Sequence, residues 1–146
     1  CVMHMQGEPD TMQTAPAYDE VVQDIADFLS QRLADVTEVG INLDRVIIDP
    51  GFGFGKTAEQ NFELLARLSE LQDIGQPMLV GLSRKSMISS VLDRSPEQRM
   101  AASVALALMA VERGARIVRV HDVAATFDAL SMWQTTRHTL SQSQHA

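Results

Sequence analysis

The sequence contains a single cysteine, Cys1, among its 146 residues, so no disulfide can form within the chain. It is also poor in aromatic residues (5%) and in basic ones, with 12 Lys and Arg against 19 Asp and Glu and a formal net charge of −7. Nucleic acids and anionic membranes bind basic surfaces, so neither is expected as the main partner. No apolar run approaches the roughly 20 residues of a membrane span, and we expect a cytoplasmic protein.

What is present indicates one domain of the α/β class. Hydrophobic residues make up 45% and charged residues 21% of the chain, which is ordinary for a globular protein. We expect a domain over residues 1–140 and a polar tail over 141–146. Apolar, non-alternating strands separated by helical patterns predict a parallel sheet covered by helices. The expected strands are the end of one at 1–5, then 45–49, 78–81 and 115–120; the expected helices are 18–39, one after Thr57, 85–92, one from Pro96 to about Gly114, and 123–137, and 7–16 is expected to be a loop.

Polar residues at the strand ends favour a (β/α)₈ barrel over a doubly wound sheet. Asp49, Gly81–Ser83, Arg119 and His121 all lie at carboxyl ends of expected strands. The active sites of barrels are built at that end. A whole barrel needs roughly 250 residues. We therefore expect a partial barrel, made of three complete βα units plus the end of a preceding strand.

The stretch DPGFGFGKT, residues 49–57, looks like a P-loop, but Pro50 stands where that motif needs its first glycine. Residues 57–60 instead fit a helix capping box, so Lys56 and Thr57 are predicted to start a helix. Phe54 in a glycine-rich loop suits a flat ring as ligand, and Asp49 suits a pair of N–H donors. The spacing leaves an alternative equally open, in which Asp49 caps a turn and the glycines only shape a tight loop.

The stretch GLSRKS, residues 81–86, suggests an anion site at the start of a short helix. Ser86 is expected in its first turn, where the N–H groups favour a carboxylate or phosphate, and Lys85 adds a positive charge. The structural alternative is simple capping by Ser83, with Arg84 and Lys85 solvated.

The stretch RVHD, residues 119–122, suggests a phosphate site. Arg119 offers a planar fork for phosphate and His121 can donate to the same group. The alternative is a structural ion pair of Arg119 with an Asp of a neighbouring strand. Asp122 is expected to cap the last helix, and the four histidines have no metal-ligand spacing, so no zinc site is expected.

Four stretches together resemble bacterial dihydropteroate synthase, a pterin-binding enzyme family. They are, in order, MHMQGEPDTMQ at 3–13, DPGFGFGK at 49–56, GLSRKSMI at 81–88 and RVHDV at 119–123. The resemblance covers the chain to about Leu140. It implies a barrel that joins p-aminobenzoate to 6-hydroxymethyl-7,8-dihydropterin pyrophosphate, giving dihydropteroate and pyrophosphate. This step belongs to folate biosynthesis and is the target of sulfonamides.

The resemblance also implies a role for each matching residue, together with Mg²⁺ as cofactor and a homodimer. These residues are Lys85, Asp49 and Arg119 for catalysis; Met3, Asp49, Gly81, Lys85 and Arg119 for the pterin; Phe54, Lys85 and Ser86 for p-aminobenzoate; and Arg119 and His121 for the pyrophosphate. The metal ligand is expected upstream of Cys1.

The same resemblance implies that the first four strands, and most of the fifth, lie upstream of Cys1. We therefore expect a C-terminal half that is inactive alone. Two alternatives remain open: a pterin-binding methyltransferase domain with the same fold and different chemistry, or a truncated, non-catalytic relic.

Overall fold

The computed structural model describes residues 1–8, 12 and 16–143, with side chains described as far as His138. Strands are written β, α-helices α and 3₁₀ helices η. Their order is β1 (Val2–Met3), α1 (Val21–Glu38), η1 (Leu43–Arg45), β2 (Ile48–Asp49), α2 (Ala58–Ala66), η2 (Leu68–Ile74), β3 (Met78–Val80), η3 (Ser86–Ser90), η4 (Pro96–Gln98), α3 (Met100–Glu112), β4 (Ala115–Val118) and α4 (Val123–Ser143). Residues 9–11 and 13–15 of the expected loop lie outside the described residues.

The strands form a parallel sheet in the order β1-β2-β3-β4, so each pairs with the strand before it in the chain. Met3 lies opposite Asp49, and Val80 lies opposite Val118. A doubly wound sheet reverses its strand order at a switch point, whereas a barrel adds each strand beside the last. The expectation of a partial barrel is therefore confirmed by the strand order.

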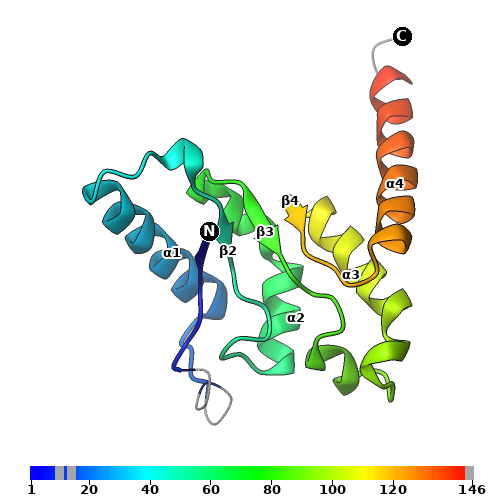
Figure 1. Ribbon diagram of the computed structural model, residues 1–146, viewed down its shortest axis with the longest axis horizontal. Coiled ribbons are helices and arrows are strands. Elements are labelled where there is room, and N and C mark those ends of the chain that lie inside the picture. The colour runs from blue at the N-terminus through cyan, green and yellow to red at the C-terminus, as the bar shows by residue number, and fades with distance from the viewer. Residues whose placement is uncertain (9–11, 13–15, 144–146) are drawn as a thin grey trace.

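Helices pack against one face of this sheet. Helix α1 lies beside β1 at one end of the row of strands, and the α3–α4 pair lies beside β4 at the other end (Figure 1). The core on the covered face includes Ile25 and Leu29 of α1, Ile48 of β2 and Leu64 of α2, all fully buried. The opposite face, which is the interior of a barrel, is more open. Leu79 is half-buried there and its register partner Ile117 is exposed.

Both predicted capping boxes are present, but the elements that follow them are shorter than expected. Thr57 and Gln60 exchange the two hydrogen bonds of the box at the start of α2. The expected single helix then divides at Arg67 into α2 and the 3₁₀ helix η2, which Gly75 ends with a φ of 85°. The second box likewise begins only the 3₁₀ turn η4, ahead of α3.

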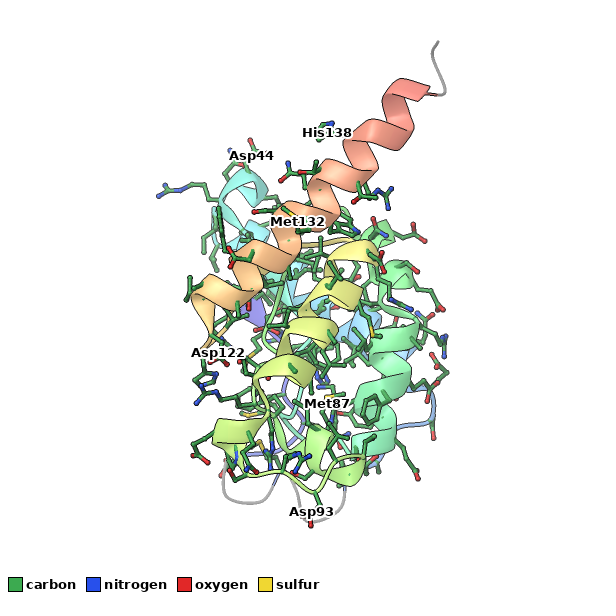
Figure 2. The ribbon with its side chains drawn as sticks, turned by 90° about the vertical axis from the view of Figure 1, so that its right-hand side faces the viewer. Asp44, Met87, Asp93, Asp122, Met132 and His138 are labelled. Atoms are coloured by element: carbon green, nitrogen blue, oxygen red, sulfur yellow. The ribbon has the colours of Figure 1, made fainter. Side chains whose placement is uncertain are left out.

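Other boundaries also differ from the sequence expectations. The expected helix at 85–92 is the five-residue 3₁₀ helix η3, and η1 shortens the expected strand at 45–49. Helix α4 continues to Ser143, into the expected polar tail, and its C-terminal part around His138 projects from the rest of the molecule (Figure 2). Within the described part of the chain, none of the helices is long and apolar enough to cross a membrane.

Candidate functional site

Asp49 ends β2 with a carboxylate that is only 2% exposed. Its Oδ1 accepts a hydrogen bond from the Gly51 amide at 2.8 Å, and its backbone carbonyl accepts one from the His4 amide at 2.9 Å. Its Oδ2 lies 3.6 Å from Nη2 of Arg119. The expected turn cap is therefore present at Oδ1, while Oδ2 faces the Arg119 guanidinium at the carboxyl ends of the strands; acceptance of N–H donors from a ligand stays a prediction.

The loop after Asp49 is held from several sides. The Gly53 amide donates to Oδ1 of the buried Asn61 at 2.8 Å, and the Tyr18 hydroxyl donates to the Gly55 carbonyl at 2.7 Å. Gly51 has a φ of 72°, and a Cβ there would overlap the His4 carbonyl. These contacts give the glycine loop one defined path across the end of the sheet.

Lys56 is a residue whose role the sequence pattern missed. It precedes the helix cap at Thr57 and is turned back into the loop, with only 3% of its surface exposed. Its Nζ donates to the carbonyls of Gly51 at 2.9 Å and Phe54 at 3.1 Å, and lies 2.9 Å from Nδ1 of His4. The one signal in the sequence is a lysine directly after a glycine-rich loop, where its side chain can reach backbone carbonyls.

Phe54 and Lys85 face each other across the site. The Lys85 Nζ lies 4.3 Å from the centre of the Phe54 ring, within the range of a cation–π contact. Burial lowers the pKa of Lys85, the Arg119 charge lowers it further, and Asp49 opposes this. A Cβ on Gly53 would lie 3.1 Å from Cδ of Lys85, so this glycine lets the lysine lie close over the loop.

A hollow of about 220 Å³ lies beside these groups, at the carboxyl ends of β3 and β4. The residues that line it are Gly81, Ser83, Lys85, Arg119, Val120 and His121. A Cβ on Gly81 would lie 3.1 Å from Nη2 of Arg119, so the absence of a side chain there gives the guanidinium its place.

A larger hollow, of about 410 Å³, lies between η2, β4 and α4. Trp133 and Leu130 are among its lining residues, and Arg116 is the one charged residue in that lining. We assign the site to the smaller hollow because Lys85 and Arg119 line it and the buried Asp49 carboxylate lies 3.6 Å from Arg119.

The structural alternative for GLSRKS is wrong in two details. Ser83 does not cap η3, whose N-cap residue is Lys85; its Oγ instead accepts from the His121 amide at 3.2 Å and lies 3.0 Å from Nδ1 of His121. Arg84 is not simply solvated, because its guanidinium pairs with Asp122 at 2.7 Å. The carboxylate of Asp122 is therefore engaged with Arg84, and its backbone carbonyl accepts from the Thr126 amide at the start of α4.

The remaining predicted site residues sit at the rim. Met3 ends β1, half-buried beside Asp49 in the sheet. Ser86 is exposed and directly follows Lys85 as the first residue of η3. A short 3₁₀ helix has little dipole to offer an anion, so any anchoring at Ser86 rests on its hydroxyl and nearby N–H groups.

The residues gathered here do not form a metal site. In the part of the chain that the structure describes, no three His, Cys, Asp or Glu side chains are grouped so as to hold a metal ion. One carboxylate oxygen of Asp49 accepts a hydrogen bond from the Gly51 amide, and the other lies toward Arg119. The neighbouring side chains are cationic, which disfavours a bound cation.

Comparison with known proteins supports the resemblance in the sequence. A family model described as "Pterin binding enzyme" matches residues 1–121. The chain is 54% identical over 136 residues to the dihydropteroate synthase of Haemophilus influenzae, covering 93% of this chain and 50% of that protein.

Two solved structures of dihydropteroate synthases are similar to the whole fold. The Yersinia pestis protein, solved with a sulfonamide drug, is 45% identical with a TM-score of 0.93, covering 95% of this chain and 51% of that one. The Xanthomonas albilineans protein, solved in complex with 7,8-dihydropteroate, is 48% identical with a TM-score of 0.85, covering 92% and 49%. The chain thus spans about half the length of the relatives it matches.

Proposed function

The chain belongs to the pterin binding enzyme family, and we propose that it forms the substrate-binding half of a dihydropteroate synthase. The observation that carries the proposal is the convergence of Asp49, Lys85 and Arg119 at the carboxyl ends of β2, β3 and β4. The relatives described above are named for this activity, which favours it over a pterin-binding methyltransferase.

The pterin is recognised by the buried carboxylate. Asp49 accepts N–H donors from the amino-pyrimidine edge of the ring through Oδ2, since Oδ1 already accepts from Gly51. The 3.6 Å separation from Arg119 is longer than a direct hydrogen bond, so this oxygen retains acceptor capacity. Met3 and Gly81 line the slot, and Lys85 contacts the ring from the next strand end.

The aminobenzoate lies against Phe54 and Lys85. The ring of Phe54 provides a flat apolar wall, and Lys85, held over that ring at 4.3 Å, borders the second substrate with its charge. Ser86 receives the carboxylate through its hydroxyl, at the exposed start of η3.

Arg119 and His121 hold the pyrophosphate. Both line the hollow at the end of β4, and the ring of His121 is oriented by Ser83. In the reaction, the bond from the pterin methylene carbon to the pyrophosphate oxygen breaks, the aminobenzoate nitrogen bonds that carbon, and the nitrogen loses a proton. The cations stabilise the charge that develops on the leaving group.

Two further parts of the proposal concern groups outside this chain. Mg²⁺ is the expected cofactor; no three His, Cys, Asp or Glu side chains of the described residues are grouped to hold it, and we propose that its ligand lies in the other half of the barrel, so no step is assigned to it here. We also propose a homodimer that works in the cytoplasm, in line with the single cysteine of the sequence.

The experiment joins this chain to the half of the Haemophilus influenzae relative that it does not match. Pyrophosphate release by this hybrid barrel, with both substrates and Mg²⁺, is the expected result, and the chain alone is expected to be inactive. Turnover by the chain alone contradicts that expectation, and an inactive hybrid that folds overturns the proposed function and favours the relic.

Asp49→Asn tests the pterin assignment in the same hybrid. We expect the affinity for the pterin pyrophosphate, measured by calorimetry, to fall at least about tenfold, the value of a hydrogen bond to a charged group. Asp44→Asn, a change of an exposed carboxylate on η1, is the control. Unchanged affinity in Asp49→Asn rejects the assignment, and tighter binding of a methyl-folate than of the pterin pyrophosphate favours the methyltransferase.

A further inference from the structure

The amine of Lys56 lies inside the glycine loop with each of its hydrogens directed at an acceptor. The acceptors are the carbonyls of Gly51 and Phe54 and Nδ1 of His4, at 2.9, 3.1 and 2.9 Å. An ammonium group has three donors and no acceptor, so this set of partners matches its charged form.

The two carbonyls belong to residues that control substrate-facing groups. The Gly51 amide holds Oδ1 of Asp49, and the Phe54 amide donates back to the Gly51 carbonyl at 3.1 Å. The Phe54 ring lies under Lys85. One buried amine therefore joins the turn that orients the carboxylate to the residue that carries the aromatic wall.

His4 completes the arrangement from β1. Its amide donates to the Asp49 carbonyl, and its ring packs edge-on against Phe28 with centroids 4.9 Å apart. Burial and the neighbouring Lys56 charge lower the pKa of His4 to about 4. The ring is therefore neutral at neutral pH, and since a charged amine can only donate, contact with charged Lys56 requires Nδ1 to be the unprotonated nitrogen.

We propose that Lys56 is a positioning residue that sets the placement of the Asp49 carboxylate relative to the Phe54 ring, and so couples the pterin site to the aminobenzoate site. The inference rests on the proposed function for the identity of the two ligands. Lys56 itself touches neither reacting atom; it acts through the backbone of Gly51 and Phe54.

The charges around Lys56 make this arrangement sensitive to pH. Burial lowers the pKa of Lys56 to about 7; Asp49 of β2 opposes the shift, and Lys85, from the loop after β3, adds to it. His4 faces it from β1, and Arg119, after β4, faces the same Asp49 carboxylate. Loss of the proton removes one of the three donors, so the loop is held less well above neutral pH.

The test replaces Lys56 by Met, which has similar length and no donor, with Arg45→Met as a control that removes an exposed cation from η1. In the 146-residue chain, hydrogen exchange of the Gly51–Gly55 amides is expected to accelerate in Lys56→Met and not in Arg45→Met. In the hybrid barrel, KM for both substrates is expected to rise about tenfold, equivalent to losing one charged hydrogen bond, with a smaller effect on kcat.

The pH profile separates positioning from a general loss of stability. KM of the unsubstituted hybrid is expected to rise as the pH passes 7, and this rise is expected to be absent in Lys56→Met. His4→Asn, which keeps an acceptor near the Nδ1 position, is expected to raise KM less than His4→Leu.

The outcomes keep this inference distinct from the proposed function. Unchanged loop exchange in Lys56→Met overturns the inference, whether or not the hybrid is active. An effect confined to kcat, or equal effects in His4→Asn and His4→Leu, also overturns it. An inactive hybrid with faster loop exchange in Lys56→Met rejects the proposed function alone, because the exchange result still shows that Lys56 holds the loop.

Discussion

Arg84 and Asp122 form a two-point ion pair between the loop after β3 and the loop after β4. Nη2 of Arg84 donates to Oδ1 at 2.7 Å and Nε donates to Oδ2 at 3.2 Å, and the pairing lowers the pKa of Asp122. Arg84 adopts a φ of 59°, which is uncommon for a residue other than glycine. Because Arg84 precedes Lys85 and Asp122 follows His121, the pair ties together the two loops that carry the site.

Replacing Asp122 by Asn is expected to lower stability and weaken substrate binding together. The substitution removes the charge that the Arg84 guanidinium faces and so weakens the link between the two loops, although the Arg84 backbone stays hydrogen-bonded to Ser103 and Arg99. We expect a lower urea midpoint for the chain and a higher KM for aminobenzoate in the hybrid barrel. Asp128→Asn, an exposed change on α4, is the control; equal midpoints for the two variants would show that the pair contributes no stability.

Two glycines with similar backbone angles are expected to respond very differently to alanine. Gly75 has a φ of 85° and open space around its Cβ position, so Gly75→Ala is expected to cost about 1 kcal/mol from the left-handed conformation alone. Gly51 has a φ of 72°, and its Cβ would collide with the His4 carbonyl, so Gly51→Ala is expected to cost more than about 3 kcal/mol. Urea unfolding measures both, and equal costs would refute the tight approach of β1 to the loop.

The neutral state of His4 predicts a loss of stability in mild acid. The pKa of His4 is about 4 in the folded chain and 6.5 in the unfolded chain. As the pH falls, the unfolded chain therefore binds the proton before the folded chain does. Stability therefore falls as the pH drops from 6.5 to 4, by up to about 3 kcal/mol. The urea midpoint is expected to fall less steeply over this pH range in His4→Asn than in the unsubstituted chain. The carboxylates titrate in both proteins, so equal slopes would show that His4 does not cause the loss of stability.

Shortening the aromatic wall is expected to affect one substrate and not the other. Phe54→Leu removes the ring beneath Lys85, and a cation–π contact is worth about 1 kcal/mol, so KM for aminobenzoate is expected to rise about fivefold. KM for the pterin pyrophosphate is expected to stay the same, in contrast to Lys56→Met, which alters both. Phe127→Leu, on the exposed side of α4, is the control. A change in the KM for the pterin pyrophosphate alone would contradict the assignment of Phe54 to the aminobenzoate site.

Local patterns in the sequence were sufficient for much of the fold. The capping boxes at Thr57 and Ser95 depend only on two residues three positions apart, so a local pattern is enough to predict them. Both are present. The same patterns overestimated the helices that follow, because a periodic apolar face does not distinguish an α-helix from a 3₁₀ turn packed against the same core.

The residues that face the proposed ligands were also visible in the sequence, because they end strands. Carboxyl ends of parallel strands meet at one edge, so Asp49, Gly81 and Arg119 had to come together once the strand order was sequential. Their motifs identified the family, and the family model covers residues 1–121.

Only the tertiary structure decided what holds those residues in place. Lys56 and His4 are 52 positions apart, and Arg84 and Asp122 are 38 apart, so no local pattern links them. A lysine beside glycines reads as a solvated or ligand-binding cation until its burial is known, and Asp122 reads as a helix cap until its partner is known. The chemical groups at the mouth follow from the sequence, whereas their supports follow from which side chains the packed sheet brings within hydrogen-bonding distance.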